Sequence, residues 1–145
     1  ILDLPKQRGC RVFLSAAQTI ADQTDVKIEF DSEKYDTQNE FDSTTNYRLT
    51  VTKDGTYQIN ARITTTGLDD GAYFEVAAWK NGTREIYLAR VYGAGANQFP
   101  MANGSAALEL NAGDYVEIYV WHNSGASVAV EGTADDTNVE IIKIR

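Results

Sequence analysis

The stretch from Leu110 to His122 constrains the fold more than any other part of this chain. A short turn, Ala112-Gly113-Asp114, separates two segments in which apolar and polar residues alternate. After the turn, alternate positions form two sets, each of which we call a parity of the strand. One parity holds Val116, Ile118, Val120 and His122, and the other holds Tyr115, Glu117, Tyr119 and Trp121. Because successive side chains of a strand point to opposite faces, this period of two predicts two antiparallel strands joined by a turn.

Comparable segments recur along the chain, and none has helical periodicity with caps. The clearest is 56–64, whose apolar parity holds Tyr57, Ile59, Ala61 and Ile63. Asn81-Gly82 predicts a tight hairpin between strands at 72–80 and 84–91. Other strands are expected at 11–15, 26–30, 47–51, 105–110, 127–131 and 138–145. Several short strands separated by turn signals favour an all-β sandwich or barrel.

Polar and Gly-rich segments between these strands predict loops. A turn is expected at 53–55, with Gly55 tolerating positive φ. Longer loops are expected at 31–45, with room for a short strand, at 92–104, ending in an Asn103-Gly104 turn, and at 133–137. Residues 1–10 are interpreted as a lead-in or arm, and 11–145 as one domain, since 145 residues suffice for one core.

The composition excludes several classes of partner. The formal net charge is -8, so nucleic acid is not an expected partner. No apolar run is long enough to cross a bilayer, and direct membrane insertion is not expected. Cys10 is the single cysteine, which excludes a disulfide within the chain and leaves open a free thiol or an interchain bridge.

Three groups of residues, in order, resemble the globular heads of the complement C-one-q and tumour necrosis factor superfamily. The first is Arg11-Val12-Phe13-Leu14-Ser15-Ala16, and the third is Leu110-Asn111-Ala112-Gly113-Asp114. The middle group is Asp54-Gly55-Thr56-Tyr57, preceded by Phe41-Asp42 and Tyr47-Arg48-Leu49 and followed by Trp79-Lys80-Asn81-Gly82. The segments Tyr35-Asp36-Thr37 and Phe41-Asp42, with Asn46, resemble bacterial and bacteriophage members more than animal ones.

The resemblance implies an antiparallel jelly-roll sandwich of about ten strands that assembles as a compact homotrimer. It also implies that 56–64 lies on the sheet facing the threefold axis. The residues expected near that axis are Gln58, Asn60, Arg62, Glu109 and Glu140. Three Arg62 side chains near one axis are costly without partners, so Arg62 is predicted to pair with Glu109 or Glu140, within or between protomers; the alternative is a solvated rim.

Enzymatic chemistry has little support in the sequence. His122 is the only histidine, it lies on an apolar parity, and no G-x-S-x-G motif is present. Paired carboxylates for a glycosidase would have to come from Glu75, Glu109, Glu117 or Glu140. Because such residues on strand faces usually serve solubility, no catalytic residue is assigned.

No metal site is assigned and no cofactor is expected, although calcium is kept as an alternative. Oxygen ligands of the kind that calcium prefers occur in acidic loops, without EF-hand spacing. The residues are Asp31, Glu33, Asp36, Asp69 and Asp70. The competing interpretation is that these loops are simply solvated.

Ligand binding is expected at loops carried by the rigid sandwich. The candidate residues are Asp36, Asp42, Tyr92, Phe99, Asp135 and Asp136. Aromatic rings can bind the faces of sugars, and the chain offers several: Trp79, Trp121, Tyr73, Tyr87 and Tyr92. Their alternative role is core or subunit interface. Tyr92 and Phe99 are expected to be the more exposed because they fall in a Gly/Ala/Asn segment.

Two functions follow as hypotheses. The first is a non-enzymatic trimeric head on a virion or bacterial surface structure, which binds a glycan or protein receptor as part of a larger assembly. The second is a structural trimer, a capsid decoration or fibre tip, for which residues 1–10 form the docking arm. Either places the protein on a virion or extracellular surface, or among secreted and cell-surface bacterial proteins.

Overall fold

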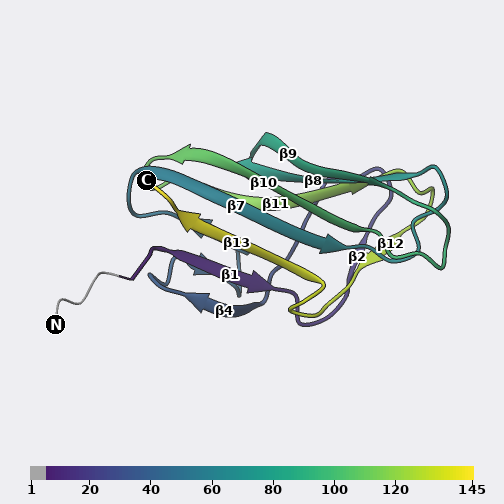
Figure 1. Ribbon diagram of the computed structural model, residues 1–145, viewed down its shortest axis with the longest axis horizontal. Coiled ribbons are helices and arrows are strands. Elements are labelled where there is room, and N and C mark those ends of the chain that lie inside the picture. Colours follow the sequence, from purple (N-terminus) through teal and green to yellow (C-terminus); the bar gives the residue numbers. More distant parts are fainter. Residues whose placement is uncertain (1–5) are drawn as a thin grey trace.

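The computed structural model describes residues 6–145, which form a sandwich of antiparallel strands (Figure 1). Thirteen strands follow one another along the chain, and five of them have only two or three residues. They are β1 (Gly9–Phe13), β2 (Gln18–Ile20), β3 (Val26–Lys27), β4 (Ser32–Asp36), β5 (Phe41–Asp42), β6 (Arg48–Thr50), β7 (Gly55–Thr64), β8 (Tyr73–Lys80), β9 (Thr83–Tyr92), β10 (Met101–Leu110), β11 (Tyr115–His122), β12 (Val128–Val130) and β13 (Thr137–Lys143).

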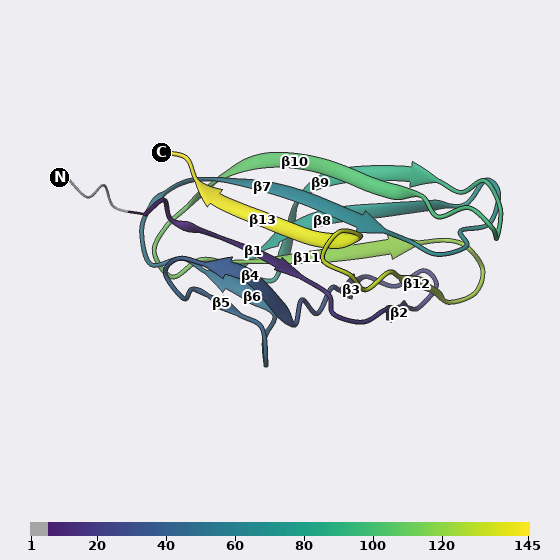
Figure 2. The ribbon, with the colours of Figure 1, turned by 60° about the horizontal axis from the view of Figure 1, so that its bottom comes forward.

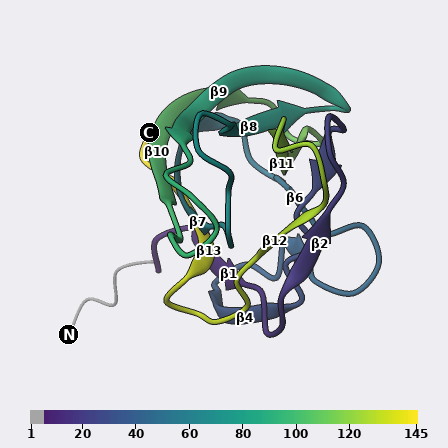
Figure 3. The same ribbon diagram turned by 90° about the vertical axis from the view of Figure 1, so that its right-hand side faces the viewer.

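Two large sheets pack face to face (Figures 2 and 3). The inner sheet has the order β10-β7-β13-β1-β4, and the outer sheet has the order β5-β6-β11-β8-β9, with β3 also paired to β11. A small pair, β12-β2, lies near one end of the sandwich. The all-β jelly-roll prediction is confirmed. Within residues 6–145 there is no helix, and therefore none that could cross a membrane.

The core lies between the sheets and is built by the apolar parity of each strand. On β7, Tyr57, Ile59 and Ile63 are almost completely buried, as predicted from the alternation. The Tyr57 hydroxyl donates to the Lys53 carbonyl oxygen at 3.0 Å, so its burial leaves no polar atom unsatisfied. Phe74 and Val120 meet them from the outer sheet, and each such apolar side chain contributes about 1.5–3 kcal/mol.

The turn at Gly113-Asp114 is tied to the hairpin at Asn81-Gly82. Asn81 and Gly82 have φ of 52° and 82°, so the predicted hairpin is confirmed. Asp114 accepts from Asn81 Nδ2 and from the Asn111 N–H, both at 2.8 Å. The Asn81 bond is the main cause that lowers the pKa of Asp114. The family-like turn, which connects β10 of the inner sheet to β11 of the outer sheet, is therefore tied to the β8–β9 hairpin at one end of the sandwich.

Two glycines predicted to form turns have a different role. Asn103-Gly104 lies inside β10, and Gly55 begins β7 without a positive φ. A Cβ on Gly104 would overlap the Leu88 carbonyl oxygen of β9, and one on Gly55 would press on the Arg145 carbonyl oxygen. The turn predictions were wrong because both glycines serve close backbone approach, which the sequence does not distinguish from positive φ.

Three further boundaries differ from the predictions. The segment 31–45 holds two strands, β4 and β5, instead of one long loop with room for a short strand. β4 is polar because it is an edge strand of the inner sheet, where charged residues are common. The predicted strand at 26–30 is regular only over Val26–Lys27. β1 begins at Gly9, inside the predicted lead-in, whereas residues 1–5 of that lead-in lie outside the described residues.

Candidate functional site

Each large sheet carries a hollow on the face that points away from the core, among several hollows of the described surface. The outer cleft, about 220 Å³, lies on β8, β9 and β11. It is lined by Asp25, Tyr73, Glu75, Ala77, Arg84, Tyr87, Tyr119, Val120 and Trp121. The inner hollow, about 480 Å³, is lined by Arg11, Asn60, Ala61, Arg62, Asn103, Gly104, Ser105, Asn138 and Glu140.

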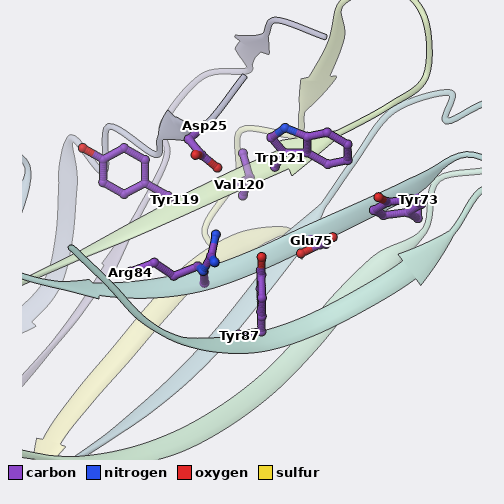
Figure 4. Close-up of a pocket in the computed structure, with 9 residues that line it drawn as sticks. Asp25, Tyr73, Glu75, Arg84, Tyr87, Tyr119, Val120 and Trp121 are labelled. Atoms are coloured by element: carbon purple, nitrogen blue, oxygen red, sulfur yellow. The ribbon is translucent and has the colours of Figure 1, made fainter. Parts of the chain in front are cut away.

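Strand register explains why the outer cleft exists. Ala77 of β8 pairs with Tyr119 of β11 on one side and with Tyr87 of β9 on the other. The small alanine side chain therefore lies between two tyrosines on the same face of the sheet, and it forms a floor with aromatic walls. In Figure 4, Tyr119 and Trp121 come from one strand and Arg84 and Tyr87 from another, with Glu75 between them.

Irregular pairing of β9 places its side chains at the cleft. The β8–β9 register shifts between Val76 and Ala77 and again between Ala78 and Trp79. Arg84 pairs with Trp79, Tyr87 with Ala77 and Arg90 with Glu75, although these β9 residues are three apart. Simple alternation would turn Tyr87 away from Arg84 and Arg90. The extra residues of β-bulges correct the parity, a device that often re-aims side chains next to sites.

The aromatic rings of the cleft are held by neighbouring groups. The Trp121 ring lies 5.3 Å from that of Tyr73, and the Tyr119 ring is stacked 4.0 Å from that of Trp79. Burial raises the pKa of Tyr119, which stays a neutral donor and acceptor at physiological pH. Such rings offer a fixed apolar surface with polar tips.

The charged groups of the cleft are partly paired. Glu75 is buried and accepts from Arg90 Nη2 at 2.9 Å, and that guanidinium also lies 4.7 Å from the centre of the Tyr73 ring. The Arg84 guanidinium lies 4.5 Å from the centre of the Tyr87 ring. Asp25 and Arg84 are both exposed, so their polar atoms are accessible to a ligand.

The inner hollow gathers most of the residues expected near a threefold axis. Asn60, Arg62 and Glu140 line it, and the register puts Glu140 opposite Asn60. Gln58 and Glu109 share the same outward face farther along β7 and β10. All five therefore point away from the core, which agrees with the predicted parity. Their placement at an axis stays a prediction.

Arg62 has a different partner within the chain. Its Nε donates to Asn103 Oδ1 at 3.2 Å, and among the described residues it forms no ion pair with Glu109 or Glu140. Glu140 accepts instead from the Tyr35 hydroxyl, and burial, with that bond, raises the pKa of Tyr35 to about 12. Pairing of Arg62 between protomers stays a prediction.

Some of the residues predicted to lie in binding loops are in loops, and others are in strands. Phe99 lies in the connection between β9 and β10 and is 59% exposed, whereas Tyr92, 61% exposed, ends β9 rather than lying in a loop. Asp36 and Asp42 belong to β4 and β5, and both accept backbone N–H groups. Asp135 is exposed, and Asp136 accepts from the Thr133 hydroxyl. These residues do not line the outer cleft or the inner hollow.

The structure does not gather the carboxylates proposed for calcium. Within residues 6–145, no group of three or more His, Cys, Asp or Glu residues could hold a metal ion. Asp31 accepts from the Ser15 backbone N–H and hydroxyl, and Glu33 accepts from the Ser43 hydroxyl. Asp69 and Asp70 are exposed on another connection. These bonds give Asp31, before β4, and Glu33, within β4, structural partners.

The groups considered for catalysis have structural positions. His122 is fully buried, with Nε2 2.9 Å from the Ile20 carbonyl oxygen and Nδ1 accepting from the Ser124 N–H at 3.2 Å. Cys10 is buried in β1, and burial strongly raises the pKa of its thiol. An interchain disulfide through Cys10 would require the core to open.

The four glutamates do not form a glycosidase pair. Glu75 and Glu117 lie four residues apart in register on the outer sheet, about 13 Å along the strands. Glu109 and Glu140 lie on the opposite sheet and are offset by four residues of β7. Both separations exceed the roughly 5–9.5 Å of such pairs. Glu75 and Glu117 are moreover ion-paired with Arg90 and Lys27.

Tyr73, Tyr87 and Trp121 of the outer cleft were candidates from the sequence, but their meeting in one cleft with Tyr119 was not predicted. Asp25 and Arg84 were not considered as site residues. The available signal was the polar and aromatic parity of 115–121, together with the matching parity Tyr73, Glu75, Ala77 and Trp79. An outward face that alternates rings, carboxylates and one small residue indicates a hollow rather than a flat surface.

Comparison with known proteins agrees with the fold. The family model of the C1q domain matches residues 12–137. The chain is 34% identical over 116 residues to the uncharacterized protein YqcC of Bacillus subtilis (strain 168), a match covering 77% of this chain and 31% of that protein. The chain therefore spans about a third of the length of this curated relative.

Solved structures share the fold at low sequence identity. The globular domain of zebrafish complement 1qA is 17% identical, with a TM-score of 0.64 and coverage of 96% of this chain and 98% of that one. Murine APRIL at pH 5.0 is 11% identical, with a TM-score of 0.70 and coverage of 96% and 100%. Eiger TNF from S. frugiperda is 12% identical, with a TM-score of 0.69 and coverage of 96% and 93%. The resemblance seen in the sequence is confirmed: the chain belongs to the C1q domain family and has the jelly-roll fold that this family shares with tumour necrosis factor proteins.

Proposed function

We propose that this chain is the non-enzymatic, trimeric head of a bacterial or bacteriophage surface structure, and that it binds a glycan or protein receptor. Family membership supports a binding domain rather than an enzyme. The positions of His122, Cys10 and the four glutamates offer no assembled nucleophile or acid–base pair in the described chain.

Exposed apolar side chains at the edges of the sandwich carry the trimer proposal. β9 and β10 are edge strands of different sheets that lie side by side, and they expose Ile86 and Met101. The other end of the inner sheet exposes Tyr35 on β4. Strand edges with apolar side chains are usually covered in native proteins. Packing of the β9–β10 edge of one protomer on the inner sheet of the next would cover both.

The inner hollow fits the same arrangement. Its lining residues are small or short and polar, apart from the longer charged side chains of Arg11, Arg62 and Glu140. A polar face at a closed threefold interface needs partners for its charges, and charges of both signs are present.

The bacterial or phage setting is supported by the Bacillus subtilis relative. Because the chain corresponds to about a third of that protein, a head carried by a longer protein is consistent with the match. A surface location follows as part of the proposal.

A structural trimer that caps or cements an assembly is the second candidate. Its support is the anchoring of the segment before β1: Arg8 Nη1 lies 2.8 Å from Glu40 Oε1 and donates to Thr52 Oγ1 at 3.0 Å. A fixed exit point at Arg8 suits an arm that docks on a neighbouring protein.

Sedimentation equilibrium at micromolar concentration tests the shared part of both candidates. A mass three times that of the 16.0 kDa chain is expected. A monodisperse monomer would overturn the trimer. The candidates are then separated by the trimer's partner: binding of an isolated receptor or glycan supports the first, whereas binding of capsid or tail proteins through residues 1–10 supports the second.

A further inference from the structure

We infer that the outer cleft binds one pyranose ring of a neutral saccharide. This inference rests on the proposed binding function and names a ligand class and a location for it. The location is a strand face of the outer sheet, not the loops.

The size and shape of the cleft fit a single ring. Its volume of about 220 Å³ is smaller than the roughly 300–1,000 Å³ of pockets for drug-sized ligands. Ala77 supplies the floor, and Tyr87 and Tyr119 rise on either side of it. A single saturated ring in its chair form can enter between two aromatic walls, whereas a bulky side chain at position 77 would close the space.

The walls offer the surface that a sugar requires. One face of a pyranose is rich in C–H groups and packs on aromatic rings, while its hydroxyls need polar atoms at the rim. Trp121 is held against Tyr73, and Tyr119 against Trp79, so these rings lose little side-chain freedom on binding. The aromatic rims carry hydroxyl groups, and Asp25 and Arg84 add an acceptor and donors.

The balance of charge argues for a neutral ligand. Glu75 is neutralised by Arg90, which leaves Asp25 and Arg84, of opposite sign, at the rim. An aromatic cage for a quaternary ammonium ion would be expected to carry excess negative charge. An anionic ligand would meet a chain of net charge -8.

The cleft would stay open in the proposed trimer. It lies on the outer sheet, whereas the polar face expected at the axis belongs to the inner sheet. Its wall on β9, Tyr87, points to the opposite face of that strand from Ile86, which belongs to the proposed contact between protomers. Three clefts on one trimer would bind a multivalent glycan more tightly than a single sugar, because linked sites raise the effective concentration.

The test uses the whole chain and a set of methyl glycosides of glucose, galactose, mannose and N-acetylglucosamine. Saturation-transfer NMR detects binding, and tryptophan fluorescence titration gives the affinity, since Trp121 lines the cleft. A printed array of neutral oligosaccharides extends the search. Choline and inorganic phosphate serve as charged probes.

Two variants close or open the cleft, and one leaves it intact. Ala77→Leu fills the floor, and Tyr87→Ala removes a wall that is 50% exposed and not needed for the core. Each should weaken glycoside binding by about tenfold or more, because an aromatic contact and its buried area are lost. Ile144→Ala, at an equally exposed apolar side chain outside the cleft, should leave binding unchanged. Circular dichroism melts confirm that each variant is folded.

Several outcomes would overturn the inference. One is the absence of binding to any methyl glycoside or array spot, and another is binding that persists in both Ala77→Leu and Tyr87→Ala. Preferential binding of choline or phosphate in the cleft would overturn the ligand class. None of these results changes the sedimentation mass, so failure of the cleft is distinguishable from failure of the trimeric head.

Discussion

The inner and outer sheets bury the same kinds of side chain but expose different ones. Toward the core, β7 and β8 both present aliphatic and aromatic residues, such as Ile59 and Phe74. Away from it, β7 presents Asn60 and Arg62, whereas β8 presents Glu75, Ala77 and Trp79. The inner sheet therefore exposes a polar face with few aromatic side chains, and the outer sheet exposes aromatic side chains and paired charges.

This difference indicates where function resides in a sandwich of this kind. The buried parity is replaceable by any set of apolar residues of similar volume, so it specifies the fold and little else. The side chains on the exposed faces are not all required to be apolar, so they can differ between the two sheets. We interpret the polar face as suited to contact between copies, and the aromatic cleft as suited to a ligand.

The contact between the two sheets at Gly104 should give the largest effect. Gly104→Ala would force a methyl group onto the Leu88 carbonyl oxygen, and we expect a loss of about 3 kcal/mol in the free energy of unfolding. Urea denaturation measures it. Ser105→Ala, at the next and exposed position of β10, should change stability by less than about 0.5 kcal/mol. Equal stability of the two variants would mean that the sheets are not in close contact there.

Substitution of one lysine on each sheet compares the exposed faces of the two sheets. Lys27 Nζ donates to Glu117 Oε2 and to the Asn46 carbonyl oxygen, both at 2.8 Å, and Glu117 is buried. Lys27→Met should cost about 2 kcal/mol, since it leaves a buried carboxylate unpaired. Lys34→Met, on the exposed edge of the inner sheet, should cost less than about 0.5 kcal/mol. Similar losses in chemical denaturation would remove the proposed difference between the faces.

Charge reversal on the inner face tests its role in assembly. Arg62→Glu should weaken the proposed trimer about tenfold, because at the proposed axis three glutamates would replace the arginines that face Glu109 and Glu140. Sedimentation at several concentrations gives the dissociation constant. Glu109→Gln offers a milder comparison on the same face. If Arg62→Glu assembles as well as the parent chain, Arg62 lies on a solvated rim, the alternative kept from the sequence.

The smallest effect is expected at the β5–β6 turn of the outer sheet. Asp42 accepts from the backbone N–H groups of Thr44, Thr45 and Asn46, led by Thr45, and these bonds hold its pKa well below the usual range. A lowered pKa in the folded state adds stability that is complete above the unfolded pKa of about 3.9 and is lost as the pH falls through the folded value.

Asp42→Asn should therefore lower the Tm at pH 7, and the difference from the parent chain should shrink below about pH 4. Differential scanning calorimetry across this range measures both. Asp70→Asn, at an exposed aspartate, should leave the Tm unchanged at every pH. A constant Tm difference for Asp42→Asn from pH 7 to pH 3 would contradict the pKa assignment.

The strands of the core were predictable because burial imposes a local rule. Tyr57, Ile59 and Ile63 could be assigned to the core from alternation alone, and Asn81-Gly82 to a hairpin from its turn chemistry. The same dipeptide at Asn103-Gly104 was misassigned. A glycine is needed there because β10 approaches the backbone of β9, a strand about fifteen residues earlier in the chain. No local sequence pattern indicates that contact.

The candidate site was only half predictable for the same reason. Trp121 and Tyr73 were named as rings that could hold a sugar, but Tyr92 and Phe99 were preferred because loops are usually exposed. The cleft depends on Ala77 lying between Tyr87 and Tyr119, which is a matter of register. Bulges in β9 set that register, and the alternation of apolar and polar residues in the sequence does not show where a bulge lies.

The position of β13 has a consequence for how the chain folds. β13 is the last strand in the sequence, yet it lies between β7 and β1 in the middle of the inner sheet, and it pairs Ile142 with Gly9. β1 can pair early with β4 on one side, but its other side and the free side of β7 stay unpaired until β13 has been made. Such distant pairings slow folding and expose unpaired strands to aggregation in the meantime. The inner sheet therefore stays incomplete until β13 is in place, and the hollow lined by Asn60, Arg62 and Glu140 can form only then.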